Sequence, residues 1–213
     1  MLALQTNSDS LALRVRQLAD TYLTAYFEQH PDEATLDGVA NTRHDRLPDN
    51  APATLAQWQK REDAWLATLK RINPSRLAGR SEWVAYGIMR DAIEASVATR
   101  VCRFELWSVA HTGGGWLGTI TSLAALQGVG TEDARRQVLA RWHAIPAYIA
   151  TETANHREGL QRGYTAPRGN VQIALNEIDT LLATPVEQSP LYDPARRDST
   201  PGFGGELVQV IER

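Results

Sequence analysis

A glycine-rich segment in the middle of the chain has the spacing of a nucleotide-binding loop. Gly113, Gly115 and Gly118 match G-x-G-x-x-G, in which glycines let the backbone approach a pyrophosphate. That chemistry requires a βαβ unit, and the sequence offers no second strong strand to complete one. The alternatives are a turn packed on a helix and a loop that lines a cleft. The candidate cleft-lining residues are Trp107, His111, Gly113, Gly114, Trp116 and Tyr192.

The histidines do not have the spacing of a zinc peptidase. Two imidazoles four residues apart on one helix are the core of H-E-x-x-H, and no such pair occurs. His30 begins H-x-x-E, but Ala34 stands where the inverted motif needs a second histidine. We therefore predict no metal ligand, although a site built from residues distant in sequence is left open by spacing alone. The five histidines are His30, His44, His111, His143 and His156.

Nucleophilic chemistry has little support. Cys102 is the single cysteine, which precludes an intrachain disulfide, and the sequence contains no G-x-S-x-G. Its neighbours Arg100 and Arg103 could lower a thiol pKa, but a buried, inert cysteine is the favoured interpretation. We predict no catalytic residue in this sequence.

Composition narrows the remaining classes of function. The chain has 213 residues, 43% of them hydrophobic, and its 22 lysines and arginines against 25 acidic residues give a net charge of −3. These values favour a globular protein and give no general attraction to nucleic acid or to an anionic membrane. No apolar run reaches membrane-spanning length, and no targeting segment is visible. We expect the cytoplasm by default, and the periplasm or secretion if a signal was removed.

The elements that must position these residues are helices. Apolar residues recur with a period of 3.6 along most of the chain, which predicts an all-α fold, an irregular bundle of about seven to nine helices. The third helix is expected to bury Val84, Ile88, Ala92 and Ala95. Pro146 is expected to kink or split the long helix that Thr131 begins. The stretch 101–109 is expected to be an extended loop or a frayed helix end, with a strand as the alternative.

The composition changes near Pro185. We predict a helical domain at 1–184 and an irregular tail at 185–213, rich in proline and glycine, with the start of a helix at 206–213. That short apolar stripe needs something to pack on. Self-association through the unpaired face is therefore one expected interaction.

An ordered set of short motifs resembles the N-terminal part of the bacterial domain-of-unknown-function 885 family. The resemblance covers residues 20 to about 195. The matching residues are Tyr26-Phe27, Pro31, Ala34-Thr35, Gly38, His44 to Asp49, Tyr86, Met89 to Asp91, Pro146 to Ile149, Asn155, Gly159, Gly163, Pro167 and Ser189 to Tyr192.

This resemblance implies a function for the chain. Members of the family look like all-helical zinc metallopeptidases of the gluzincin type, with H-E-x-x-H in their C-terminal half. The resemblance thus implies a non-catalytic N-terminal region, a scaffold and one wall of a substrate cleft, with zinc only in a full-length relative. Its implied partner is a C-terminal catalytic half. The alternative is a stand-alone helical binding module with a Trp- and Gly-lined pocket for a ligand such as a peptide.

Overall fold

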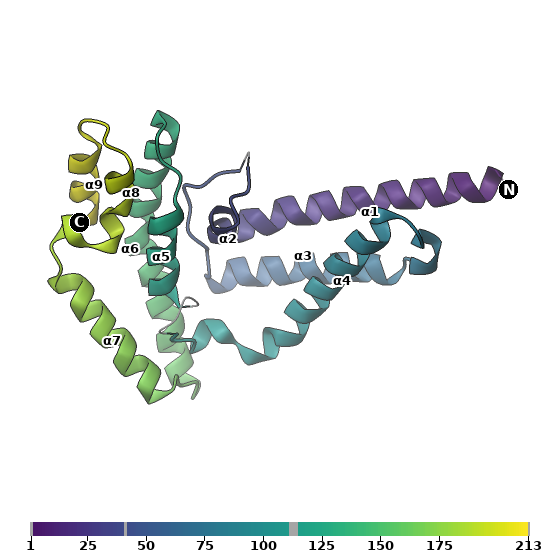
Figure 1. Ribbon diagram of the computed structural model, residues 1–213. Coiled ribbons are helices and arrows are strands. Elements are labelled where there is room, and N and C mark those ends of the chain that lie inside the picture. Colours follow the sequence, from purple (N-terminus) through teal and green to yellow (C-terminus); the bar gives the residue numbers. More distant parts are fainter. Residues whose placement is uncertain (1, 41, 111–114, 213) are drawn as a thin grey trace. The chain divides into compact units, whose positions relative to one another are not determined.

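The computed structural model describes residues 2–40, 42–110 and 115–212. Their secondary structure consists of α-helices and short 3-10 helices, without a strand, which confirms the expected all-α class. The nine α-helices of these ranges are α1 (Leu2–Gln29), α2 (Pro31–Leu36), α3 (Pro52–Lys70), α4 (Ser81–Thr99), α5 (Trp116–Leu126), α6 (Glu132–Gln161), α7 (Arg168–Ala183), α8 (Asp193–Arg197) and α9 (Phe203–Ile211) (Figure 1).

The helices form two compact units that are discontinuous in sequence. The first contains α1, α3 and α4, and the second contains α2 and α5 to α9. The segment His30–Ala51 leaves the first unit, joins the second and leads back to α3. Residues 185–212 belong to the second unit. The expected domain division after residue 184 stays a prediction about independent folding.

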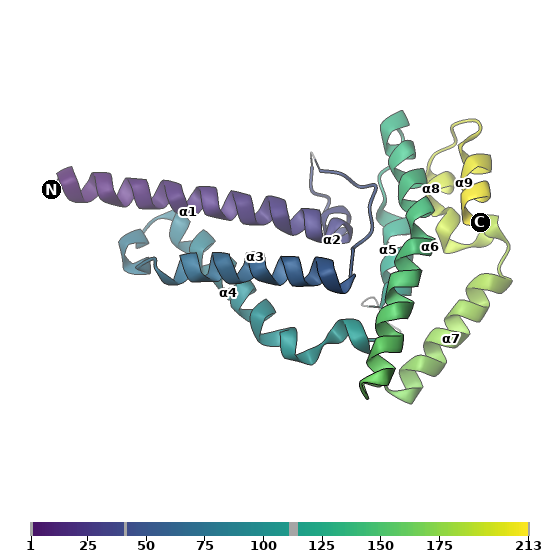
Figure 2. The same ribbon diagram turned by 180° about the vertical axis from the view of Figure 1, so that it is seen from behind.

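An aromatic core holds the first unit together. α1 and α3 run side by side in opposite directions in both views (Figure 1, Figure 2). Tyr22 of α1 meets the edge of Trp65 of α3 at 5.4 Å between ring centroids, and Trp58 lies 5.5 Å from Trp65. Burial raises the pKa of Tyr22 to about 12. Such edge-on contacts add to the stabilisation from apolar burial.

The first unit corrects the expected orientation of α4. Val84 and Ile88 are 51% and 67% exposed, whereas Tyr86 and Met89 are buried in the core. The periodicity misleads because both faces of α4 carry apolar residues. On the buried face, the Tyr86 hydroxyl donates to the carbonyl of Leu69 at 3.4 Å.

The second unit is organised around α6. Its core includes Val138 and Trp142 of α6 together with Phe203 and Leu207 of α9. The indole N–H of Trp142 donates to the carbonyl of Leu191 at 3.1 Å and so ties α6 to the 3-10 turn Pro190–Tyr192. This turn and α8 both pack on α5.

A buried arginine fixes the segment His30–Ala51 to the helices of the second unit. Arg141 of α6 is 1% exposed, and burial lowers its pKa to about 10. Its guanidinium donates to the carbonyl of Arg46 at 2.8 Å, to that of Pro31 at 3.2 Å and to the hydroxyl of Thr35 at 2.8 Å. It also bonds to the side-chain oxygen of Gln127. These partners compensate the guanidinium for the water it has lost.

Three expected local features can be compared with the structure. α6 is one continuous helix through Pro146, so the expected split is wrong, whereas the alternative of a kink stays a prediction. The stretch 101–109 is not an extended loop, because the 3-10 turn Arg100–Cys102 continues the end of α4 and the turn Phe104–Leu106 follows it. Residues 185–205 are not wholly irregular, because they include two 3-10 turns and α8, and α9 already begins at Phe203.

Candidate functional site

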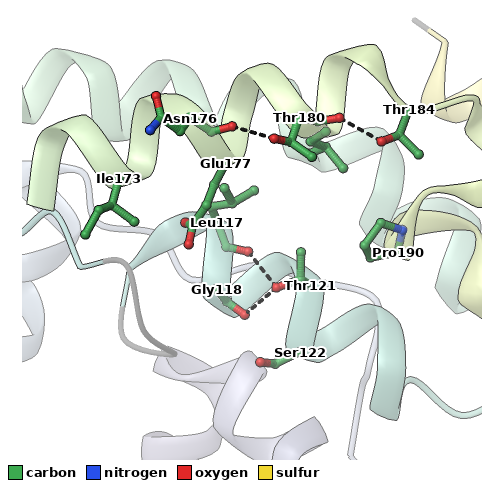
Figure 3. Close-up of a pocket in the computed structure, with 11 residues that line it drawn as sticks. Leu117, Gly118, Thr121, Ser122, Ile173, Asn176, Glu177, Thr180, Thr184 and Pro190 are labelled. Carbon is green, nitrogen blue, oxygen red and sulfur yellow. Dashed lines mark hydrogen bonds between the residues drawn. The ribbon is translucent and has the colours of Figure 1, made fainter.

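A groove between α5 and α7 is the candidate site of the second unit. Its volume is about 490 Å³, within the range of small-ligand pockets. Figure 3 shows side chains of both helices directed into the space between them. The lining residues are Leu117, Gly118, Thr121, Ser122, Ile173, Asn176, Glu177, Thr180, Leu181, Thr184 and Pro190.

A glycine positions the start of α5. Gly115 precedes the helix, and a Cβ at this position would lie 2.5 Å from the carbonyl oxygen of Ala110. Any larger residue would therefore push the helix start away from the backbone of Ala110. The close approach is to the non-helical residue Ala110 and not to another helix, so the expected packing of this turn on a helix stays a prediction.

The other wall, α7, is a helix that the fold leaves largely uncovered. It extends between Pro167 and Pro185, which flank its two ends. None of its side chains is buried, and its Ile173 is 40% exposed. The apolar side chains that α7 contributes to the groove, Ile173 and Leu181, therefore line an open surface rather than a closed core.

The structure places three of the six predicted cleft residues. Trp107 follows the turn Phe104–Leu106, and its ring lies 5.5 Å from that of Phe104. Trp116 begins α5, directly before the groove residue Leu117. His111, Gly113 and Gly114 lie outside the described residues. That these positions bind a ligand stays a prediction.

Tyr192, the third placed residue, packs inside the second unit. It lies against the core around Trp142, and a Cβ on Gly204 would come 2.5 Å from its hydroxyl oxygen. The guanidinium of Arg196 lies 5.8 Å from the centre of its ring. Its turn still contributes to the groove through Pro190.

A separate buried polar cluster lies where α6 meets the end of the segment His30–Ala51. The amide of Asn50 donates to Glu152 at 2.6 Å, and the amide of Asn155 donates to the carbonyl of Asn50 at 2.9 Å. Burial raises the pKa of the Glu152 carboxyl, and burial and then Glu152 raise that of Tyr148. No member of this cluster lines the groove, so its evident task is to hold the segment against α6.

The side chains suited to metal binding are dispersed. In the ranges that the structure describes, no three histidine, cysteine, aspartate or glutamate side chains gather as a metal site would require. Among the same residues, no helix combines the length and apolar character needed to cross a membrane.

Comparison with known proteins assigns a family. A family model described as "Bacterial protein of unknown function (DUF885)" matches residues 31–209. The chain belongs to this family. Neither the curated proteins nor the solved structures contain a match to it. The DUF885 match includes both walls of the groove and the segment that Arg141 holds.

The groove lining of this DUF885 chain was missed by the sequence analysis. The candidate cleft residues were mostly aromatic residues and glycines, so they included Trp116 but not the groove residues Thr121 and Thr180. The available signal was α7 itself, a helix between two prolines that carries a row of polar residues, Asn176 and Thr180, on the side that lines the groove. Sequence alone does not reveal that α5 faces it.

Proposed function

We propose that this chain is a non-catalytic helical region of a zinc-dependent peptidase, and that the groove between α5 and α7 is one wall of its substrate cleft. The zinc peptidase assignment rests on the resemblance described in the sequence analysis. The match to the DUF885 family supports the family membership on which this assignment depends, and does not bear on zinc or on peptide hydrolysis. The groove is the observation that carries the proposal, because it offers a ligand-sized, partly apolar surface formed by two helices.

Binding of peptides in the groove tests this function. Fluorescein-labelled hexapeptides of random sequence are titrated against the purified chain, and binding is followed by fluorescence anisotropy. Thr180→Trp fills the groove with an indole and should abolish binding. Leu182→Trp places the same indole on α7 at an exposed position outside the groove, and should bind like the wild type. Equal binding by both variants would contradict the assignment of the groove.

The catalytic part of the proposal has its own measurement. We expect neither peptide hydrolysis nor stoichiometric zinc in the purified chain, with zinc measured by elemental mass spectrometry after dialysis against metal-free buffer. One zinc per chain would mean that distant residues form a metal site, and would overturn the non-catalytic role.

A stand-alone binding module is the second candidate. It is favoured by the size of the groove, which would accept a small ligand or a short peptide side chain. Such a module should be monodisperse and unfold cooperatively, whereas one half of a larger enzyme should self-associate through its uncovered surface. Analytical ultracentrifugation distinguishes the two.

A further inference from the structure

The groove between α5 and α7 has one charged residue in its lining. Glu177 is that residue, and the others are apolar, amide or hydroxyl side chains, apart from a glycine. α5 carries no charged side chain at all, from Trp116 to Leu126. A ligand in this groove therefore meets a single negative charge in surroundings that are otherwise neutral.

The threonines of the lining present acceptors to the groove. Thr121 donates its hydroxyl hydrogen to the carbonyl of Leu117 at 3.1 Å. Thr180 and Thr184 donate theirs to the carbonyls of Asn176 and Thr180, at 2.8 and 2.7 Å. Each hydroxyl keeps lone pairs and a neighbouring methyl group for a ligand. These side chains therefore favour a ligand that brings its own N–H donors.

Glu177 is available to such a donor. Figure 3 shows its side chain directed from α7 towards Leu117 of α5, across the groove. Its carboxylate makes no hydrogen bond or ion pair with any residue in the described part of the chain. A cation entering the groove would thus not have to displace an internal partner.

Resting on the proposed function, we propose that the groove selects a primary ammonium group next to an aliphatic side chain of a peptide. The ammonium pairs with Glu177, and the aliphatic group packs on Leu117 and Ile173. The threonine oxygens, which extend up to two helical turns from Glu177, accept from other N–H groups of the peptide. The ammonium can be the free N-terminus of the peptide or a lysine side chain. Both sources present the same three N–H donors.

Three labelled peptides separate the possibilities. All carry fluorescein at the C-terminus: one begins with a free leucine, the second is the same peptide acetylated, and the third is acetylated with lysine following leucine. Because Glu177 is exposed, its contribution is that of a surface ion pair, so a free ammonium should tighten binding about two- to fivefold at low salt. The gain should shrink as salt is added.

Glu177→Gln should reduce the ratio of the dissociation constants of charged and acetylated peptides to about one. Asp179→Asn removes an equal charge two residues away, outside the groove, and should keep the ratio. A gain for the first peptide alone identifies the N-terminus, and a gain for the third identifies lysine. Equal binding of all three peptides, or a ratio that survives Glu177→Gln, would overturn the inference.

The binding experiments distinguish a failure of this inference from a failure of the proposed function. If the peptides bind and Thr180→Trp blocks them, yet the ammonium brings no gain, the groove remains a peptide site and only the charge selection is wrong. If no peptide binds at concentrations where the chain stays folded by circular dichroism, both proposals fall.

Discussion

At the scale of single residues, the second unit depends on buried polar side chains as much as on its apolar core. Arg141 joins the backbone at Pro31 and Arg46 to the side chain of Gln127. The Pro31 carbonyl also accepts from the hydroxyl of Thr35, whereas the Arg46 carbonyl and the Gln127 side-chain oxygen would lose the donor that Arg141 provides. A buried hydrogen-bonding group without a partner costs about 1–3 kcal/mol.

Arg141→Ala is therefore expected to lower the free energy of unfolding by about 2–4 kcal/mol, since several of these acceptors lose their donor together. Urea unfolding followed by circular dichroism measures the change. Arg157→Ala, at an exposed position of the same helix, is the matched control and should stay within about 0.5 kcal/mol of the wild type. Similar losses in the two variants would mean that the buried network contributes nothing specific.

The buried carboxyl of Glu152 should make the stability of the folded protein depend on pH. Burial raises its pKa, with Asn50 and His156 acting against that shift. At a pH between the two pKa values, the folded protein holds a proton that the unfolded chain has released. Stability therefore falls as the pH rises from the unfolded pKa through the folded one. Glu152→Gln removes the ionisable group while keeping an oxygen that can accept from Asn50.

The melting temperature of Glu152→Gln should thus exceed that of the wild type at pH 7.5, and the two should converge below about pH 3, where the carboxyl is protonated in both states. Differential scanning fluorimetry across this pH range measures the melting temperatures of both proteins. Glu206→Gln, at an exposed position, should show no such difference. A variant that is less stable than the wild type at pH 7.5 would show that the charge itself is stabilising.

At the scale of elements, the sequence was informative about where helices begin and end, and less so about which face each one buries. Thr131 caps α6 as expected, its hydroxyl accepting from the N–H of Ala134 at 3.1 Å. The expected orientation of α4 was wrong because its apolar residues recur on two faces, and the helix buries the face with Tyr86 and Met89. Glu82, which pairs with Arg16, is also buried, and no local pattern indicates that contact. The groove was missed for the same reason, since it depends on α5 and α7 meeting.

One contact between elements is tight enough to be tested directly. A Cβ on Gly159 of α6 would lie 1.9 Å from the carbonyl oxygen of Leu106, so α6 packs on the backbone of the turn Phe104–Leu106. Gly159→Ala must separate the two and should cost at least about 1–3 kcal/mol of unfolding free energy. Gly169→Ala in α7 meets open space and should leave the stability unchanged or slightly higher. Unfolding curves of the two variants that coincide would refute the close packing.

At the scale of the whole molecule, each compact unit has a hydrophobic core of its own. The core of the first unit contains Leu69, and the core of the second contains Leu207, both with no exposed surface. A cavity in one core removes contacts only within that unit. Local opening of each unit should therefore respond to its own core.

Hydrogen exchange followed by mass spectrometry tests this independence. Leu69→Ala should cost about 2–5 kcal/mol within the first unit and accelerate exchange in α3 and α4, but not in α6. Leu207→Ala is the reciprocal variant and should accelerate exchange in α6 and α9 alone. If either substitution accelerates exchange in all of these helices, the chain unfolds as one cooperative body.

During translation, the segment His30–Ala51 is synthesised well before the arginine that anchors it. It emerges from the ribosome long before its binding partner, because Arg46 and Arg141 are 95 residues apart. At a translation rate of about 5–20 residues per second, Arg141 is synthesised roughly 5–20 s after Arg46. All of α3 and α4 is translated during that interval. The nascent chain thus carries a polar segment between α1 and α3 that has no anchor until α6 is made.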